Sequence, residues 1–171
     1  MDVKDGYNSL LSLHQSSKNF EKRVFAFIEA LMNAFVNAVG WSGDIRFAPI
    51  TNLLSGEHLA CEDHLAVNTR GGSRAHVELD VGTDTLHMTI LAVAGSIERM
   101  DLTDDWRVDF INAPQEHRPV SSEWAFQAKV NLGGDANELF ATMLEGLRQQ
   151  LRRLRFLPTT EIKPLESNET T

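Results

Sequence analysis

The densest group of side chains that could perform chemistry lies between Glu57 and His64, where two histidines flank the only cysteine of the chain. His58, Cys61 and His64 follow one another at three-residue spacing, and imidazole and thiolate groups are common ligands of zinc. On a helix this spacing drifts around the axis, and the sequence shows no second ligand pair to complete a tetrahedral site. These residues are therefore weak candidates for a metal site, and we expect the protein to need no metal or cofactor.

Cys61 is also the only residue that could act as a thiol nucleophile. His58 and His64 could supply a base, but the adjacent Glu62 raises the pKa of the thiol rather than lowering it. No glycine-rich segment flanks the cysteine to bind an oxyanion. The pattern favours a small, half-buried structural cysteine. A single cysteine also excludes an intrachain disulfide, which agrees with a reducing compartment.

A glycine-rich segment, Arg70-Gly71-Gly72-Ser73-Arg74, places backbone donors between two guanidinium groups. Such a segment could bind a phosphate or a carboxylate. It precedes no predicted helix and lacks the lysine of nucleotide-binding loops, so a turn between two strands explains it better. Arg70 and Arg74 remain a weak anion-binding alternative.

Alternating apolar residues over 73–81 and 86–94 predict a β-hairpin with one buried face. Pairing Val81 with Leu86 across a four-residue turn keeps the apolar side chains together and places Asp80 opposite His87 on the second face. A general acid–base pair could work there, although charged cross-strand pairs are also common on exposed sheets. Because acidic and apolar residues share this face, we interpret it as a partner-binding surface, formed by Glu78, Asp80, His87, Leu91, Asp104, Asp105 and Asp109.

The acidic residues are concentrated in the middle third of the chain. Residues 54–116 carry twelve acids against four arginines, which accounts for the whole formal net charge of −8. Such a field disfavours nucleic-acid backbones and favours basic partners. We therefore expect a basic protein partner and no nucleic acid.

Helices are predicted on either side of these strands. Apolar residues recur at helical spacing over Phe20–Val39, on a stripe wider than a surface helix needs, and Gly40 should end this helix. A capping pattern at Asp135–Glu138 opens a second helix over 136–156. Further strands are expected near 45–50 and 65–69, and a second hairpin should pair 106–112 with 122–132, with Phe110 opposite Trp124.

These elements predict an α+β fold with one antiparallel sheet of about four to six strands and with an N-terminal and a C-terminal helix packed on one face. We expect a flexible N-terminal segment over residues 1–17, a single domain over 18–157 and a disordered tail over 158–171. No stretch resembles a membrane span or a secretory signal, so we expect a cytoplasmic protein that does not bind membranes.

The absence of a catalytic constellation favours a non-enzymatic binding protein, an adaptor, inhibitor or chaperone-like protein that presents its acidic sheet surface to a basic partner as a homodimer. One alternative is a small enzyme or ligand-binding protein that uses the Glu57–His64 region or the Asp80/His87 sheet face. A second is an acidic DNA mimic. Size, acidity and element order resemble those of bacterial secretion chaperones and of the small inhibitor or immunity proteins of phages and mobile elements, but no motif is specific to either group, so we assign no family.

Overall fold

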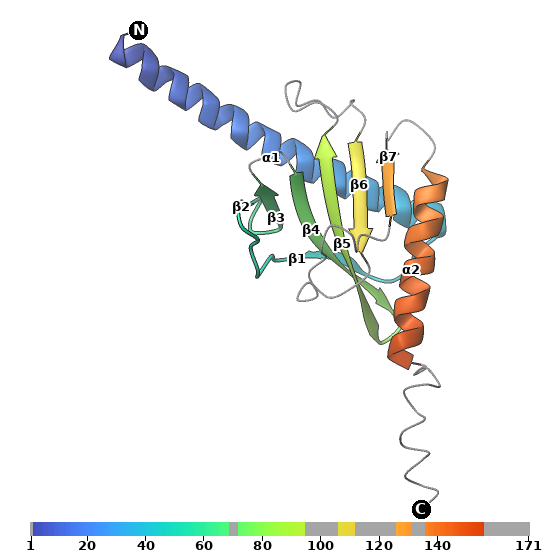
Figure 1. The fold of residues 1–171 in the computed structure, drawn as a ribbon. Helices are drawn as coiled ribbons and strands as arrows, with labels where there is room; N and C mark the ends of the chain where they lie inside the picture. Colours follow the sequence, from blue (N-terminus) through green and yellow to red (C-terminus); the bar gives the residue numbers. More distant parts are fainter. Residues whose placement is uncertain (1, 69–71, 95–105, 112–125, 131–135, 156–171) are drawn as a thin grey trace, which may run out of the picture.

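Two helices pack on one face of an antiparallel sheet (Figure 1). The computed structural model describes residues 2–68, 72–94, 106–111, 126–130 and 136–155. Within these residues the sheet has seven strands, and this confirms the predicted α+β class. In chain order the elements are α1 (Val3–Val39), β1 (Ile45–Ala48), β2 (Glu57–Ala60), β3 (Leu65–Asn68), β4 (Gly72–Val81), β5 (Asp84–Ala94), β6 (Trp106–Ile111), β7 (Phe126–Val130) and α2 (Asn137–Arg155).

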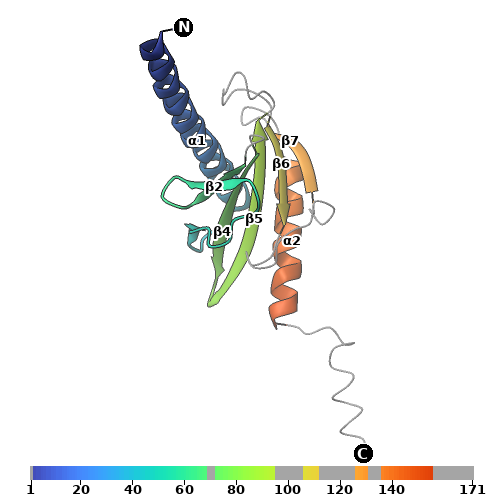
Figure 2. The same cartoon turned by 60° about the vertical axis from the view of Figure 1, so that its left-hand side comes forward.

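The first helix is much longer than the sequence pattern indicated. It ends at Gly40, as predicted, because Gly40 adopts the left-handed conformation with φ +69°. Its predicted start at Phe20 was wrong, since α1 begins at Val3. The first part of the helix extends beyond the edge of the sheet (Figures 1 and 2). Flexibility of residues 1–17 stays a prediction, and the predicted tail over 158–171 lies outside the described residues.

The central strand of the sheet is β4, which pairs with β5 along one edge. Its other edge pairs with β3 along its first half and with β1 along its second half. β2 extends the sheet beyond β3, while β6 and β7 extend it beyond β5. The sequence predicted a strand near 45–50 but not its neighbour in the sheet. In the structure β1 lies beside β4, with Arg46 opposite Glu78 of the acidic face.

Both predicted hairpin registers were wrong by two residues. Val81 pairs with Asp84 rather than with Leu86, because the turn is the two-residue Gly82-Thr83, with Gly82 at φ +59°. Two-residue turns of this kind match the twist of paired strands better than the predicted four-residue turn. In the second hairpin Phe110 pairs with Phe126, and its predicted partner Trp124 lies outside the described residues. A shift of two residues leaves every side chain on its predicted face.

The core lies between the sheet and both helices. The apolar residues of the hairpin strands and the buried faces of α1 and α2 form one cluster. This arrangement agrees with the prediction that both helices pack on one face of the sheet. The largest fully buried members include Phe27, Ile28, Leu31 and Phe35 of α1, Leu79 of β4, Leu86, Met88 and Ile90 of β5, and Phe110 of β6.

Helix α2 also closes an edge of the sheet. β6 pairs with Thr89–Ala94 of β5, so His87 lies beyond that ladder. The Gln150 side chain of α2 takes the place of a strand residue there. Its Oε1 accepts from the His87 backbone N–H at 2.7 Å, and its Nε2 donates to the His87 carbonyl at 3.0 Å. A side chain with one acceptor and one donor therefore satisfies both backbone groups of an edge residue.

Gly43, in the connection from α1 to β1, has no room for a side chain because an added Cβ would overlap the backbone carbonyl oxygen of Asp80. We expect Gly43→Ala to lower the free energy of unfolding by about 3 kcal/mol, measured by urea denaturation. The control Gly82→Ala adds its Cβ to open space and only strains a left-handed backbone, at about 1 kcal/mol. Equal losses in the two variants would contradict the close contact at Gly43.

Candidate functional site

The segment Glu57–His64 forms strand β2 and the turn into β3, not a helix. His58 faces α1, where its Nε2 lies 2.8 Å from Oε1 of Glu21, a carboxylate whose side chain is only 5% exposed. Cys61 Sγ donates to the Glu21 carbonyl oxygen at 3.6 Å, and the His64 ring stacks on Phe25 with a centroid separation of 6.2 Å. The three weak metal candidates therefore have separate partners. Within the described residues no group of three histidine, cysteine or acidic side chains could hold a metal ion.

The turn itself has an unusual backbone. Cys61, Glu62 and Asp63 all have positive φ, at 52°, 57° and 66°, although none is glycine. A left-handed conformation costs such residues about 1–2 kcal/mol each. The turn is held by the His64 N–H, which donates to the Cys61 carbonyl at 3.1 Å, and by the Asp63 carbonyl, which accepts from Ile50 at 2.7 Å. Strain of this kind is concentrated at functional sites, so the strained turn marks this region as a candidate site.

A cavity of about 460 Å³ lies between this turn and α1, lined by Lys18, Glu21, Lys22, Phe25, Cys61, Glu62 and His64. Burial, together with the carboxylates of Glu21 and Glu29, raises the pKa of the Cys61 thiol. The thiol is therefore protonated at neutral pH, and a protonated thiol is a poor nucleophile. The cavity has the size of a small-molecule site but lacks an activated cysteine.

Arg74 is buried on the face of the sheet opposite the helices. Its Nη2 donates to Oε1 of Glu57 at 2.8 Å and to the Asn52 carbonyl at 2.7 Å, and its Nε donates to Oε2 of Glu57 at 3.2 Å. The side chains of Arg74 and Glu57 are 5% and 6% exposed. The weak anion-binding prediction therefore finds no support at Arg74, because a buried carboxylate holds its guanidinium. Arg70 lies outside the described residues.

His76 and His87 lie side by side on this face, with stacked rings 5.5 Å apart and Nε2 of His76 3.4 Å from Nδ1 of His87. His76 is buried, and its Nδ1 lies 3.0 Å from the hydroxyl of Thr89. His87 is opposite Glu78 in the register, not opposite Asp80 as predicted. The predicted acid–base pair of Asp80 and His87 is therefore not formed.

The acidic residues of the predicted partner surface are partly neutralised by Arg46 of β1. Arg46 binds both oxygens of Asp80, at 2.9 and 3.3 Å, and its Nε donates to Glu78 at 3.2 Å. The hydroxyl of Thr85 donates to Asp80 at 2.9 Å. Leu91 is opposite Asp109 in the register of β5 and β6, whereas Asp104 and Asp105 lie outside the described residues. Sequence reasoning missed Arg46 because it did not pair β1 with β4.

Arg46 and Thr85 hold the pKa of Asp80 below its usual range, Arg46 being the larger cause. A depressed pKa means that this contact stabilises the fold above the unfolded pKa of Asp80, and that the contribution is lost as pH falls through the folded value. We expect Arg46→Gln to raise the pKa of Asp80, measured by NMR titration of its carboxyl carbon. Arg148→Gln, in an exposed helical position, should leave it unchanged. An unchanged pKa of Asp80 in Arg46→Gln would show that Arg46 does not cause the lowered pKa.

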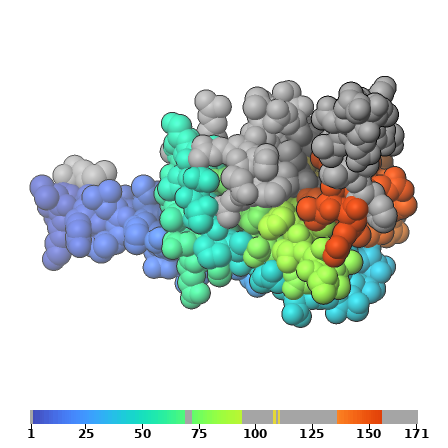
Figure 3. All heavy atoms as spheres, turned by 90° about the horizontal axis from the view of Figure 1, so that it is seen from below, coloured from blue at the N-terminus to red at the C-terminus, as the bar shows by residue number. Residues whose placement is uncertain are grey.

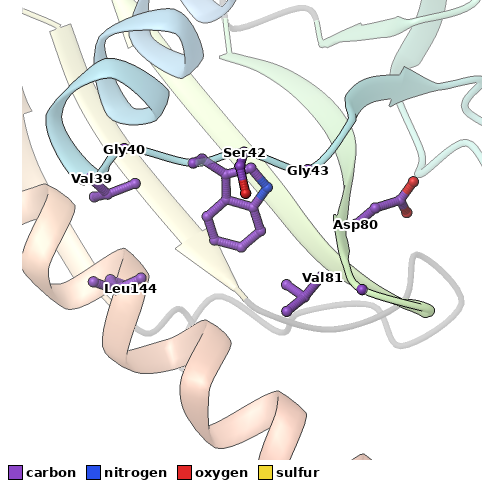
Figure 4. Close-up of a pocket in the computed structure, with 9 residues that line it drawn as sticks. Val39, Gly40, Ser42, Gly43, Asp80, Val81 and Leu144 are labelled. Atoms are coloured by element: carbon purple, nitrogen blue, oxygen red, sulfur yellow. The ribbon is translucent and has the colours of Figure 1, made fainter.

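A second, smaller cavity of about 270 Å³ lies beside the connection from α1 to β1. Figure 4 shows Val39, Val81 and Leu144 around it, with Gly40, Ser42 and Gly43 along the connection. The indole Nε1 of Trp41 is buried with no hydrogen-bond acceptor among the described residues. No acid–base pair lines this cavity.

The N-terminal part of α1 carries most of the exposed large apolar side chains among the described residues. Residues 2–19, which we call the projecting segment, extend from the body of the domain (Figure 3). Five large apolar side chains on it are 49–88% exposed: Val3, Tyr7, Leu10, Leu11 and Leu13. Successive spacings of four and three residues relate Val3, Tyr7, Leu10 and His14. The same spacings lead on along the helix to the buried Val24, Ile28, Leu31 and Phe35. This repeat was the sequence signal that could have revealed both the helix start and the exposed stripe.

Comparison with family models, curated proteins and solved structures found no match to this chain. In the part of the chain that the structure describes, neither helix combines the length and the apolar character needed to cross a membrane.

Proposed function

We propose that this chain is a non-enzymatic protein-binding module whose partner binds the projecting segment of α1. The observation that carries the proposal is the row of five exposed apolar side chains on that segment. A contiguous apolar surface on a soluble domain usually marks an interaction site. A helix with such a stripe gains most of its stability from packing. A partner that covers the stripe would therefore stabilise the helix, and burial of the stripe would stabilise the complex.

The chemistry of the titratable groups supports binding rather than catalysis. The buried carboxylates of Glu21 and Glu57 are occupied by His58 and Arg74, and the Cys61 thiol is held protonated. Contacts that hold buried carboxylates in this way are typical of structural pairing, whereas a catalytic site needs groups poised to exchange protons with a substrate.

The acidic sheet face contributes less to this proposal than the sequence suggested. Arg46 binds Glu78 and Asp80, and Arg155 of α2 binds Asp84 at 2.7 Å. A basic protein partner remains a prediction from the net charge. The partner chemistry that the projecting segment favours is an amphipathic helix with a matching apolar stripe.

The proposal is tested by photo-crosslinking in the native host. A photoreactive phenylalanine analogue is placed at Tyr7 on the stripe and, as a matched control, at Ser12 on the polar side of the same helix. We expect a protein adduct from position 7 and little or none from position 12. Equal adducts from both positions, or none from either, would contradict a partner at the stripe.

A second candidate function is favoured by the cavity beside the strained turn at Cys61, Glu62 and Asp63. There the protein would bind a small molecule between Phe25 and His64, in line with the ligand-binding alternative for the Glu57–His64 region. Fragment screening by NMR would test it. Shift changes at the cavity that disappear in His64→Ala would support it, and changes scattered over the surface would count against it.

A further inference from the structure

We propose that the partner of the projecting segment is a second copy of this chain, whose projecting segment lies antiparallel to the first. This inference rests on the proposed function, because it names the occupant of the same surface.

The projecting segment carries no net charge, although the protein is acidic overall. It carries Asp2, Lys4, Asp5 and Lys18, two acids and two bases, whereas residues 54–116 carry the whole net charge of −8. Two copies that met through the sheet face would bring like charges together, which is unfavourable. Two copies that meet through their projecting segments encounter no such repulsion.

An antiparallel arrangement also keeps the acidic domains apart. With Tyr7 opposite the partner's Leu10, the two Phe20 residues where the domains begin are separated by roughly 35 Å along the helices, at 1.5 Å per residue. That distance is several times the Debye length of about 8 Å at physiological salt. A parallel pair would place the two domains side by side at the helix separation of about 8–10 Å.

The same register brings four of the five exposed apolar side chains to the interface. Tyr7 then packs against the partner's Leu10, Val3 against the partner's His14, and Leu13 lies over the partner's Gly6. Gly6 has no side chain, so the backbone leaves room for the bulky leucine. The twofold symmetry of the pair repeats each contact, as a closed homodimer interface requires. Antiparallel helices also align their dipoles favourably.

Self-association is measured by sedimentation equilibrium over a concentration series reaching the millimolar range. Because a single helix pair is a small interface, we expect a dimer of micromolar affinity. Leu10→Lys should weaken the dimer on the order of a hundredfold, since each substitution acts twice in the symmetric pair. The matched control Ser12→Lys adds the same charge to the polar side of the helix and should leave the affinity nearly unchanged. Circular dichroism checks that both variants keep their helix content.

Orientation is tested by disulfide trapping in a Cys61→Ser background. Chains carrying Val3→Cys are mixed with chains carrying His14→Cys under mild oxidation. In an antiparallel pair we expect a disulfide between the two variants. Chains carrying Val3→Cys alone should form little disulfide, because their thiols would lie roughly 16 Å apart at 1.5 Å per residue. Efficient crosslinking of Val3→Cys with itself would overturn the antiparallel arrangement.

A chain that stays monomeric throughout the series would overturn the inference. The proposed function fails separately, because it predicts an adduct at position 7 in the host whatever the partner is. An adduct to a different protein, together with a monomeric purified chain, would retain the binding function and exclude the second copy as partner.

Discussion

Replacing Glu57 with glutamine is expected to lower the free energy of unfolding by about 3–5 kcal/mol, the usual cost of leaving a buried charge without its partner. The Arg74 guanidinium would lose its counter-charge and one of its two acceptor oxygens on residue 57, and the new amide NH2 would face a donor, in a site where both side chains are almost fully buried. The Leu54 N–H, which donates to Glu57 at 2.7 Å, would lose a charged acceptor as well. Urea denaturation measures the loss.

A double-mutant cycle separates the pair from its surroundings. We expect Arg74→Met alone to be similarly destabilising, and the double variant Glu57→Gln, Arg74→Met to recover a large part of the stability, because no unpaired charge is left. Glu145→Gln, which breaks an exposed pair with Arg148, serves as the matched control and should cost less than about 1 kcal/mol. Additive losses at Glu57 and Arg74 would show that the two side chains do not act as a pair.

The second large effect is expected at Phe35, near the other end of α1. Phe35 is completely buried, and its ring lies 5.7 Å from that of Phe140 and 6.2 Å from that of Trp41. Phe35→Ala should therefore cost about 3–5 kcal/mol, the sum of lost burial and an unfilled cavity. Thermal or urea unfolding at concentrations low enough to keep the chain monomeric provides the measurement.

The control for Phe35 lies on the same helix. Leu10 is 65% exposed, so Leu10→Ala should change the unfolding free energy of the monomer by less than about 0.5 kcal/mol. The contrast divides α1 into a part that stabilises the domain and a part available to a partner. A loss at Leu10 comparable to that at Phe35 would mean that the projecting segment packs on the domain instead of extending away from it.

The sequence pattern identified which side chains face the core but not which residues are paired. Alternation over Val77, Leu79 and Met88 has a period of two, so every register shifted by two residues satisfies it equally well. The choice among these registers was made by the turn, where Gly82 permits a tight two-residue connection. The α1 prediction failed for a related reason. A helix start was sought where a continuous apolar stripe begins, at Phe20, whereas the helix continues through the sparser apolar pattern of the projecting segment.

The candidate sites were harder to predict because their contacts join distant parts of the chain. His58 meets Glu21 from 37 residues away, and Arg46 meets Asp80 from 34 residues away. No local periodicity contains such pairs. The left-handed turn at Cys61 could not be predicted either, because the segment has neither the glycine nor the asparagine that usually adopts that conformation.

The contact of Gln150 with His87 has a consequence for the behaviour of the protein in concentrated solution. The unpaired edge of a strand is a template on which another chain can add a strand, and such additions lead to aggregation. The backbone groups of His87 are already bound by Gln150, and an incoming strand would first have to displace that side chain of α2. The C-terminal helix thus protects this end of β5 from the addition of a strand by another chain.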